Sequence, residues 1–444
     1  MFQNILDSKR GFVLIGSIVV VLVLTVAYQY WSRRITPAKI VAGKMLFEHP
    51  WTVDDELSPQ GDGLGPVFND VSCVACHFQG GTGGAGPNSK NVHKFTVLPT
   101  AIRPDVVRGV VHHRSVEPEL QEDISQIQQR FPEISGVRFT DGCSTSTTPA
   151  FDPVLSMSIN TPALFGLGKI EEIPSYAIAY HGSARMLSSV ANELTGKFTS
   201  KGFGRVKMSG TTVGKFGWQG EFGTIEDFVA EACAVELGLS VPGRRQDKPG
   251  AFEEDSDARF DLSRRQLHEM VCFVKALPRP KQVLPTDELA LATVRRGERM
   301  FQVMGCADCH VPDLGGVEGI YSDFHLYNLT PPENDDGYGA AVRTVDSQVK
   351  FPLSETLPNE WKTPPLWGVA DSAPYFHDGS AGTLEAAIHL HHGDGHYSRQ
   401  LYMNATLDDR VAIITFLKTL RAPDMKEFES KWDGSSLAAT DQAD

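Results

Sequence analysis

Two stretches, Cys73-Val74-Ala75-Cys76-His77 and Cys306-Ala307-Asp308-Cys309-His310, decide the fold of this 444-residue chain. In each Cys-x-x-Cys-His motif the two thiols can form thioethers to the vinyl groups of a haem, and the adjacent histidine can bind the iron. A zinc site would need a second ligand pair at zinc spacing, and a thioredoxin-type dithiol would not need the histidine. The motifs therefore predict two covalently bound c-type haems.

The N-terminus contains an apolar segment that predicts a membrane anchor. Residues 11–31, GFVLIGSIVVVLVLTVAYQYW, carry no charge and as a helix would cover the roughly 30 Å hydrocarbon core of a bilayer. Covalent haem implies an exported body, so we expect a single-pass protein of the cytoplasmic (inner) membrane, in contact with the lipid bilayer, with its body facing the periplasm. A cleaved signal peptide is the alternative, but the run is long for one and no small-x-small cleavage site follows.

Each haem motif lies between two predicted helices. A Gly-x-x-x-Phe segment precedes each motif, at residues 43–47 and 297–301, and an apolar helical pattern closes each half, at residues 267–277 and 411–420. The expected fold is mainly α, with two cytochrome c-like haem domains, long irregular loops and one N-terminal transmembrane helix. The expected division is residues 1–36 for the anchor, 37–284 for a first domain with insertions, 285–425 for a second domain and 426–444 for a polar tail.

The net charge limits the class of partner, and the remaining cysteines limit the chemistry. The formal net charge of −14 argues against a nucleic-acid partner and is compatible with a basic redox partner protein, although it also serves solubility. Cys143, Cys233 and Cys272 form no paired dithiol motif, so nothing indicates thiol redox chemistry.

Four further segments carry a resemblance to a known family. They are residues 160–174 (NTPALFGLGKIEEIP), 215–239 (KFGWQGEFGTIEDFVAEACAVELGL), 320–329 (IYSDFHLYNL) and 361–393 (WKTPPLWGVADSAPYFHDGSAGTLEAAIHLHHG). Together they resemble the bacterial di-haem cytochrome c peroxidase and MauG superfamily, and within it the di-haem oxidoreductase family once labelled thiol oxidoreductases. The resemblance covers most of the chain after residue 36.

The resemblance implies different sixth ligands for the two haem irons. Where the superfamily places the distal ligand of its six-coordinate haem, this chain has His391, so the second haem is expected to be held by His310 and His391, with His392 as the substitute. Two imidazoles favour a low potential and an electron-relaying haem. The haem on His77 is then the reactive one.

Two side chains correspond to residues that act between and over the haems in the superfamily. Trp218 corresponds to the tryptophan between the two haems, and a large aromatic filling the interface is the alternative. Glu236 falls where peroxidase relatives carry a carboxylate over the open haem, where it could move a proton between peroxide oxygens. The register is two residues short and Phe228 replaces an expected glutamine, so an ordinary helical glutamate is the alternative.

The resemblance also implies candidate ligands of iron or calcium, at positions that match such ligands in the superfamily. His93, sixteen residues after His77, is a candidate switchable haem ligand, with His112, His113 and His181 as alternatives. Asn160, with the backbone near Pro364, is a candidate calcium site. His377 is expected to be a packing residue. Tyr327-Asn328-Leu329 replaces the His-Asp-Met run of the nearest family, so Tyr327 or His325 is a candidate ligand there.

These inferences predict a membrane-anchored periplasmic di-haem c-type cytochrome oxidoreductase of the peroxidase and MauG type. Its expected partners are peroxide and a redox protein, either another cytochrome or a membrane complex. The alternative is a pure electron-transfer cytochrome subunit of a respiratory or photosynthetic membrane complex.

Overall fold

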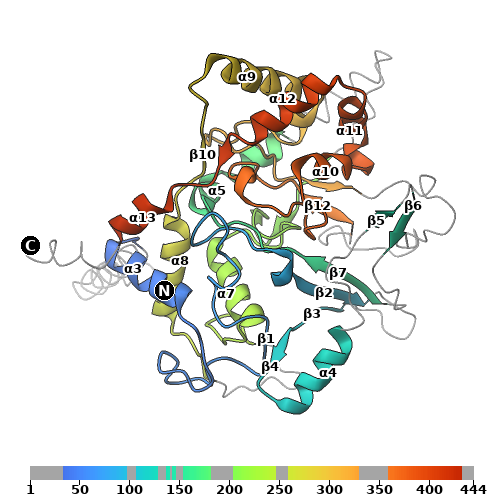
Figure 1. The fold of residues 1–444 in the computed structure, drawn as a ribbon. Helices are drawn as coiled ribbons and strands as arrows, with labels where there is room; N and C mark the ends of the chain where they lie inside the picture. The colour runs from blue at the N-terminus through green and yellow to red at the C-terminus, as the bar shows by residue number, and fades with distance from the viewer. Residues whose placement is uncertain are drawn as a thin grey trace, which may run out of the picture.

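In the computed structural model, the leading helix of the first half is α3 (Pro37–Glu48). The structure describes residues 34–97, 107–128, 137–140, 143–146, 154–181, 204–246, 259–329 and 359–432. Helix α3 begins where the Thr36 hydroxyl accepts a hydrogen bond from the Lys39 amide, with Pro37 in the first turn. It packs against α8 (Arg264–Ala276), which starts with a Ser263–Gln266 capping box. Both helices predicted to flank the first haem motif are therefore present (Figure 1).

In the second half, α9 (Glu288–Val303) packs across α12 (Leu407–Leu417), as α3 packs across α8 in the first half. These two pairs are the helix crossings of the fold. Asp287 caps α9 by accepting from the Ala290 amide, and Thr406 caps α12 by accepting from the Asp409 amide. The pair lies at the top of Figure 1, whereas α3 and α8 lie at its left. In both crossings a glycine lies at the contact: a Cβ on Gly43 would meet the Glu269 carbonyl oxygen at 2.0 Å, and one on Gly297 the Ala412 carbonyl oxygen at 1.9 Å.

Further described helices lie outside these two crossings. Helix α7 starts at its Thr224 cap and ends at Glu236, and α10 starts at its Thr383 cap and ends two residues before His391. The described helices outside the two crossings are α4 (Pro118–Gln128), α5 (Leu167–Glu172), α7 (Ile225–Glu236), α10 (Leu384–His389), α11 (His396–Met403) and α13 (Met425–Lys431), with 3-10 turns η1 (Asn88–Lys90), η2 (Cys306–Asp308), η3 (Val369–Asp371) and η4 (Gly393–Gly395).

Strands make up more of the chain than the sequence analysis expected. An antiparallel sheet in the order β3-β2-β7 pairs His93 with Val111 on one side and with Ser158 on the other. The remaining strands form two-stranded ladders: β1 with β4, β5 with β6, β8 with β9, β10 with β13, and β11 with β12. The strand bounds are β1 (Val67–Phe68), β2 (Val92–Val97), β3 (Val107–Val111), β4 (Arg114–Ser115), β5 (Val137–Thr140), β6 (Cys143–Ser146), β7 (Val154–Ile159), β8 (Met208–Ser209), β9 (Thr212–Val213), β10 (Lys281–Gln282), β11 (Leu326–Asn328), β12 (Glu360–Lys362) and β13 (Leu420–Arg421).

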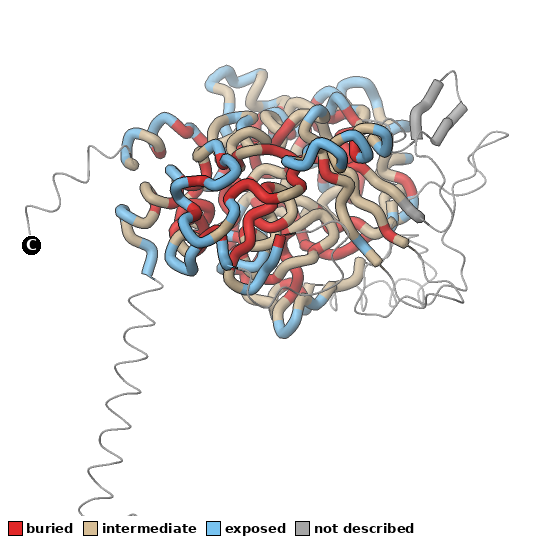
Figure 2. The backbone as a smooth tube through the Cα atoms, turned by 90° about the horizontal axis from the view of Figure 1, so that it is seen from below, coloured by how far each residue is buried: buried red, intermediate tan, exposed pale blue. Residues whose placement is uncertain are grey.

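Two apolar clusters form the core. The larger one surrounds α3, α7 and α8 and includes Phe47 and Phe273; it also takes in Phe324 and Phe428 from the second half of the sequence. The smaller one joins α9 to α12 through Phe301 and Phe416, whose ring centroids are 5.5 Å apart. Figure 2 shows these buried segments beneath exposed loops. The division of the chain into domains at residue 285 stays a prediction.

The predicted fold class is wrong in two respects. The chain is not mainly α with irregular loops, because the insertion of the first half contains the β3-β2-β7 sheet, built on runs rich in β-branched residues such as residues 92–97. In addition, no helix among the described residues is long and apolar enough to cross a membrane, and the predicted segment 11–31 lies outside those residues. The predicted transmembrane helix and single-pass inner-membrane localisation are therefore withdrawn.

Candidate haem sites

The second Cys-x-x-Cys-His motif places His310 opposite His391. The motif follows α9 through Gly305, whose positive φ of 76° allows the turn into η2. The ring of His310 contacts Phe301 on one side, with centroids 6.3 Å apart. His391, just beyond α10, turns its ring toward His310, with centroids 6.4 Å apart and an interplanar angle of 60°. Two segments eighty residues apart in the sequence thus present facing imidazoles.

Both of these imidazoles are fixed by backbone carbonyls. His310 Nδ1 lies 3.0 Å from the Tyr321 carbonyl oxygen, and His391 Nδ1 lies 2.8 Å from the Ala387 carbonyl oxygen. Burial lowers the pKa of His310 to about 4 and also lowers the pKa of His391, which favours neutral rings. A neutral ring that donates from Nδ1 keeps the lone pair of Nε2 for a metal.

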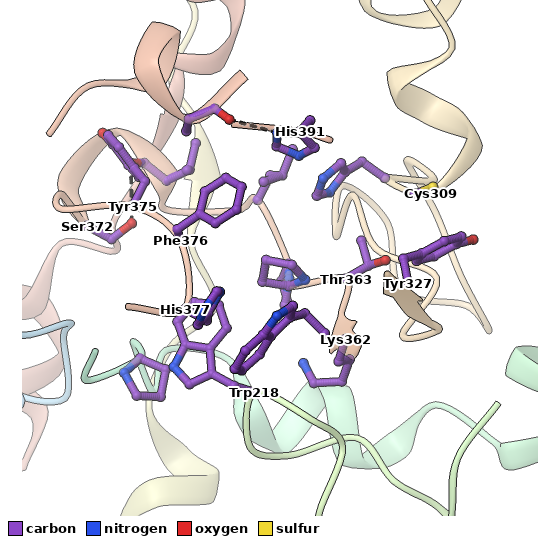
Figure 3. A pocket seen from close by; sticks show the side chains of 18 of the residues that line it. Trp218, Cys309, Tyr327, Lys362, Thr363, Ser372, Tyr375, Phe376, His377 and His391 are labelled. Carbon is purple, nitrogen blue, oxygen red and sulfur yellow. Dashed lines mark hydrogen bonds between the residues drawn. The ribbon is translucent and has the colours of Figure 1, made fainter. Parts of the chain in front are cut away.

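The spacing of the two rings fits one iron between them. A metal–imidazole bond is about 2.0 Å long, so imidazoles on opposite faces of one ion have centroids roughly 6.2–6.4 Å apart. The rings also line a cavity of about 320 Å³ together with Cys306 and Cys309. Figure 3 shows His391 and Cys309 on this pocket, with Trp218 and Lys362 at its lower side. The residues present therefore fit a haem.

The first motif builds the same proximal side around His77. His77 Nδ1 lies 3.1 Å from the Gly84 carbonyl oxygen, and burial lowers its pKa to about 4. Its ring contacts Phe47 at 6.3 Å, as the ring of His310 contacts Phe301. Within the described parts of the chain, no second imidazole ring is paired with His77. The two sites thus share the attachment side and differ on the opposite side.

Glu236 lies near the first motif, at the C-terminal end of α7. Its Oε2 accepts a 2.6 Å hydrogen bond from Asn69 Nδ2, and its backbone carbonyl accepts one from the Asn69 amide. Burial, together with the charges of Asp70 and Glu236, raises the pKa of the Cys76 thiol to about 12. The carboxylate is therefore held in place beside the attachment cysteines of the first site.

The candidate distal histidines of the first half form a group of their own. His93, on β2, contacts the ring of His113, with centroids 5.8 Å apart, and the His113 amide donates to Asn69 Oδ1. Burial lowers the pKa of both rings, and for His113, where the charge of His93 adds to the effect, to about 4. His112 is held by the Val235 carbonyl at 3.0 Å. His93 is therefore beside His113 and close to the residue that holds Glu236.

Trp218 and Asn160 connect the two halves. Trp218 Nε1 donates to the Asn160 carbonyl oxygen at 2.7 Å, and the Asn160 amide donates to the His377 carbonyl oxygen at 2.7 Å. The His377 ring stacks on Trp361 with centroids 3.4 Å apart, as a packing residue would. The Asn160 side chain donates to Gly86 O and Asn91 Oδ1. Trp218 lines the pocket of the second motif, so its indole stands between the His310 side and the inserted half.

Near the second site, the structure differs from the prediction for Tyr327 and His325, and it adds Lys362, which was not predicted. Tyr327 and His325, proposed there as ligands, belong to a buried network: the Tyr327 hydroxyl donates to Asp323 Oδ2 at 2.7 Å, and His325 Nε2 lies 3.0 Å from the Ile178 carbonyl oxygen. Lys362 lines the pocket although it is almost fully buried. A lysine next to Trp361 in a three-residue strand gives no signal by itself that it will be buried.

Comparison with known proteins gives a family match for the part of the chain that contains the second motif. Residues 252–420 match the family model described as "Di-haem oxidoreductase, putative peroxidase". This part of the chain is similar to the di-haem oxidoreductase family. The predicted resemblance is confirmed, and similarity to a di-haem family implies haem cofactors.

Relatives and a solved structure match parts of the chain. Cytochrome c551 peroxidase of Nitrosomonas europaea is 32% identical over 162 residues, which are 35% of this chain and 40% of that protein. Cytochrome c551 peroxidase of Pseudomonas aeruginosa is 31% identical over 143 residues, 31% of this chain and 36% of that protein. A hydrazine synthase structure of Kuenenia stuttgartiensis has 17% identity and a TM-score of 0.31, covering 59% of this chain and 72% of that one. The chain spans at most about two fifths of the curated peroxidases it matches.

Proposed function

We propose that this di-haem oxidoreductase reduces peroxide at a first c-type haem, attached to Cys73 and Cys76 and held by His77. A second c-type haem would be attached to Cys306 and Cys309, would be held by His310 and His391, and would supply electron transfer. The names of the two curated relatives support peroxide as the oxidant and a redox protein as the electron donor. A calcium ion at Asn160 and a division into two haem domains at residue 285 belong to the same proposal.

The proposal that the first haem is reactive and the second transfers electrons rests on one observation. His310 has a facing imidazole at a centroid distance of 6.4 Å, whereas in the described residues His77 has none. When bound, haem supplies an iron that accepts and delivers single electrons, and a small molecule can bind it only where the sixth position is open. Two imidazoles leave no such position at the second site. The proposal therefore assigns the chemistry to the first site.

The side chains around His77 can handle protons. Asn69 Nδ2 donates to Glu236 Oε2 and orients the carboxylate, a group that can hold a proton and return it. His113 and His93 lie on the other side of Asn69 and are kept neutral by burial, so neither adds a positive charge that would repel a proton. Glu236 is thus the proposed acid-base group.

The Trp218 indole is the proposed bridge for electrons. Its hydrogen bond to the Asn160 carbonyl and the bond from the Lys362 amide to its own carbonyl fix it from both halves of the chain. An aromatic side chain held this way fills the space between the two sites and excludes water from it.

Peroxide turnover of the protein carrying both haems tests this function, with Glu236→Gln beside Glu231→Gln. Glu231 is on the same helix and pairs with Arg244 on the surface, which makes it a matched control. We expect Glu236→Gln to lower the peroxide-dependent kcat by about 10²–10⁴-fold, because it removes a proton carrier, and Glu231→Gln to leave it unchanged. A wild-type protein with two haems and no peroxide turnover would contradict the proposal and support a pure electron-transfer cytochrome.

A further inference from the structure

The pocket beside His310 and His391 contains a buried ammonium group. Lys362, the last residue of β12, is only 6% exposed and lines the pocket. Its Nζ lies 5.3 Å from the centroid of the Phe324 ring. Throughout the described parts of the chain, no oxygen accepts a hydrogen bond from this Nζ. A largely buried cation that lacks an acceptor in the protein is costly.

Two other lysines of this region have acceptors. Lys215 lines the same pocket, and its Nζ donates to the Glu171 carbonyl at 2.9 Å and the Ile173 carbonyl at 2.6 Å. Lys94 Nζ donates to Glu221 Oε1 at 3.0 Å. The missing acceptor of Lys362 is therefore a property of its position, because Lys215 is equally buried and has two acceptors.

The nearest carboxylates already have partners. Glu221 pairs with Lys94, and Asp323 accepts from the Tyr327 hydroxyl and from the His325 amide. Burial lowers the pKa of Lys362 to about 8, against the charges of Glu221 and Asp323, which raise it. Neither carboxylate lies close enough to bind Nζ, so an anion from outside the described chain would complete this group.

We propose that Lys362 binds a propionate carboxylate of the haem held by His310 and His391. A haem attached to Cys306 and Cys309 through its vinyl groups carries its two carboxylates on the other side of the ring. Figure 3 shows Lys362 beside Trp218 and away from Cys309, on the same pocket. Because the Lys362 amide donates to the Trp218 carbonyl, this contact ties the haem edge to the segment that contains the proposed electron bridge. The inference rests on the second haem of the proposed function, but not on peroxide chemistry.

A positive charge at a propionate favours the reduced, less positive iron. Lys362→Met is therefore expected to lower the reduction potential of the second haem. We expect at least a tenfold change in its reduction equilibrium, which is 59 mV for one electron. Lys362→Arg keeps the charge and should stay close to wild type. Lys281→Met, a change at an exposed lysine of β10, is the matched control and should leave the potential unchanged.

The experiment is a potentiometric titration of the protein with both haems, followed through the low-spin signal of the second haem. If Lys362→Met does not yield folded protein, Lys362→Gln removes the same charge and carries the test. An unchanged potential in the Met or Gln variant would overturn the inference. Repeating the wild-type titration with added acetate at constant ionic strength separates the two sources of carboxylate: a potential that depends on acetate would mean that Lys362 binds a free anion, and would also overturn it. If the Lys362 variants show the expected shifts in potential but the wild-type protein does not turn over peroxide, the result would contradict the proposed function and not this inference.

Discussion

The two haem motifs are built alike on one side and differently on the other. At His77 and at His310 the ring donates from Nδ1 to a carbonyl and contacts a phenylalanine at 6.3 Å. Opposite His310, the segment after the short helix α10 contains His391. In the first half, Asn69 instead contacts both Glu236, which lies near Cys76, and His113, whose ring contacts His93. The attachment motif thus determines the proximal side, and the segments inserted around it determine what the iron can do.

Removing the attachment cysteines would test this comparison most severely. Replacing both Cys306 and Cys309 by serine should reduce the haem content from two per chain to one, because no thioether can form at the second motif. The pyridine haemochrome assay measures that content. The paired variant Cys73→Ser with Cys76→Ser should also leave one haem, but only this variant should keep the low-spin signal assigned to His310 and His391. Equal spectra for the two paired variants would show that the sites do not differ as described.

A test with a smaller expected effect compares the stability contributed by the α3–α8 and α9–α12 contacts. Gly297→Ala and Gly43→Ala each place a Cβ within about 2 Å of a carbonyl oxygen of the facing helix. We expect each to lower the free energy of unfolding by about 1–3 kcal/mol, because the helices must move apart. Urea denaturation of the two variants measures this. Gly382→Ala, where no atom lies within 4 Å, is the control, and a loss as large as that of the other two would rule out the steric explanation.

The smallest expected effect is a pH dependence of the free energy of unfolding that arises from His113, in the first half. The pKa of His113 in the fold, about 4, is below its ordinary value near 6.5, so the unfolded chain binds more protons between these values. Stability is therefore complete above about pH 6.5 and falls as the pH decreases toward 4, by at most about 1.4 kcal/mol per pH unit. His113→Gln should flatten this slope when the free energy of unfolding is measured at pH 7 and pH 5. The same slope in the variant and in the wild type would contradict the assignment to His113.

The sequence predicted the parts of the molecule that depend on local pattern. The four flanking helices follow from the Gly-x-x-x-Phe segments and from apolar spacing, and the proximal histidines follow from the two motifs. The facing position of His391 came from the resemblance of the segment around it, because nothing in the local pattern of His389, His391 and His392 distinguishes the ligand.

The remaining features depend on contacts between distant segments. The β3-β2-β7 sheet joins residues more than fifty positions apart, so the strand 154–159 has no local partner to reveal it. The position of Glu236 depends on Asn69, and the burial of Lys362 depends on Phe324 and on the Trp218 carbonyl. Spacing along the chain does not contain these contacts, whereas a single local run such as residues 92–97 could have indicated a strand.

The central claim is that the second haem has two imidazole ligands and the first does not. Low-temperature EPR of the oxidised protein, wild type beside His391→Ala, tests it most directly. The account predicts a low-spin signal from the second haem that His391→Ala converts to high spin, while the signal of the first haem and the spectrum of His389→Ala stay as in the wild type. A His391→Ala spectrum identical to that of the wild type would contradict it.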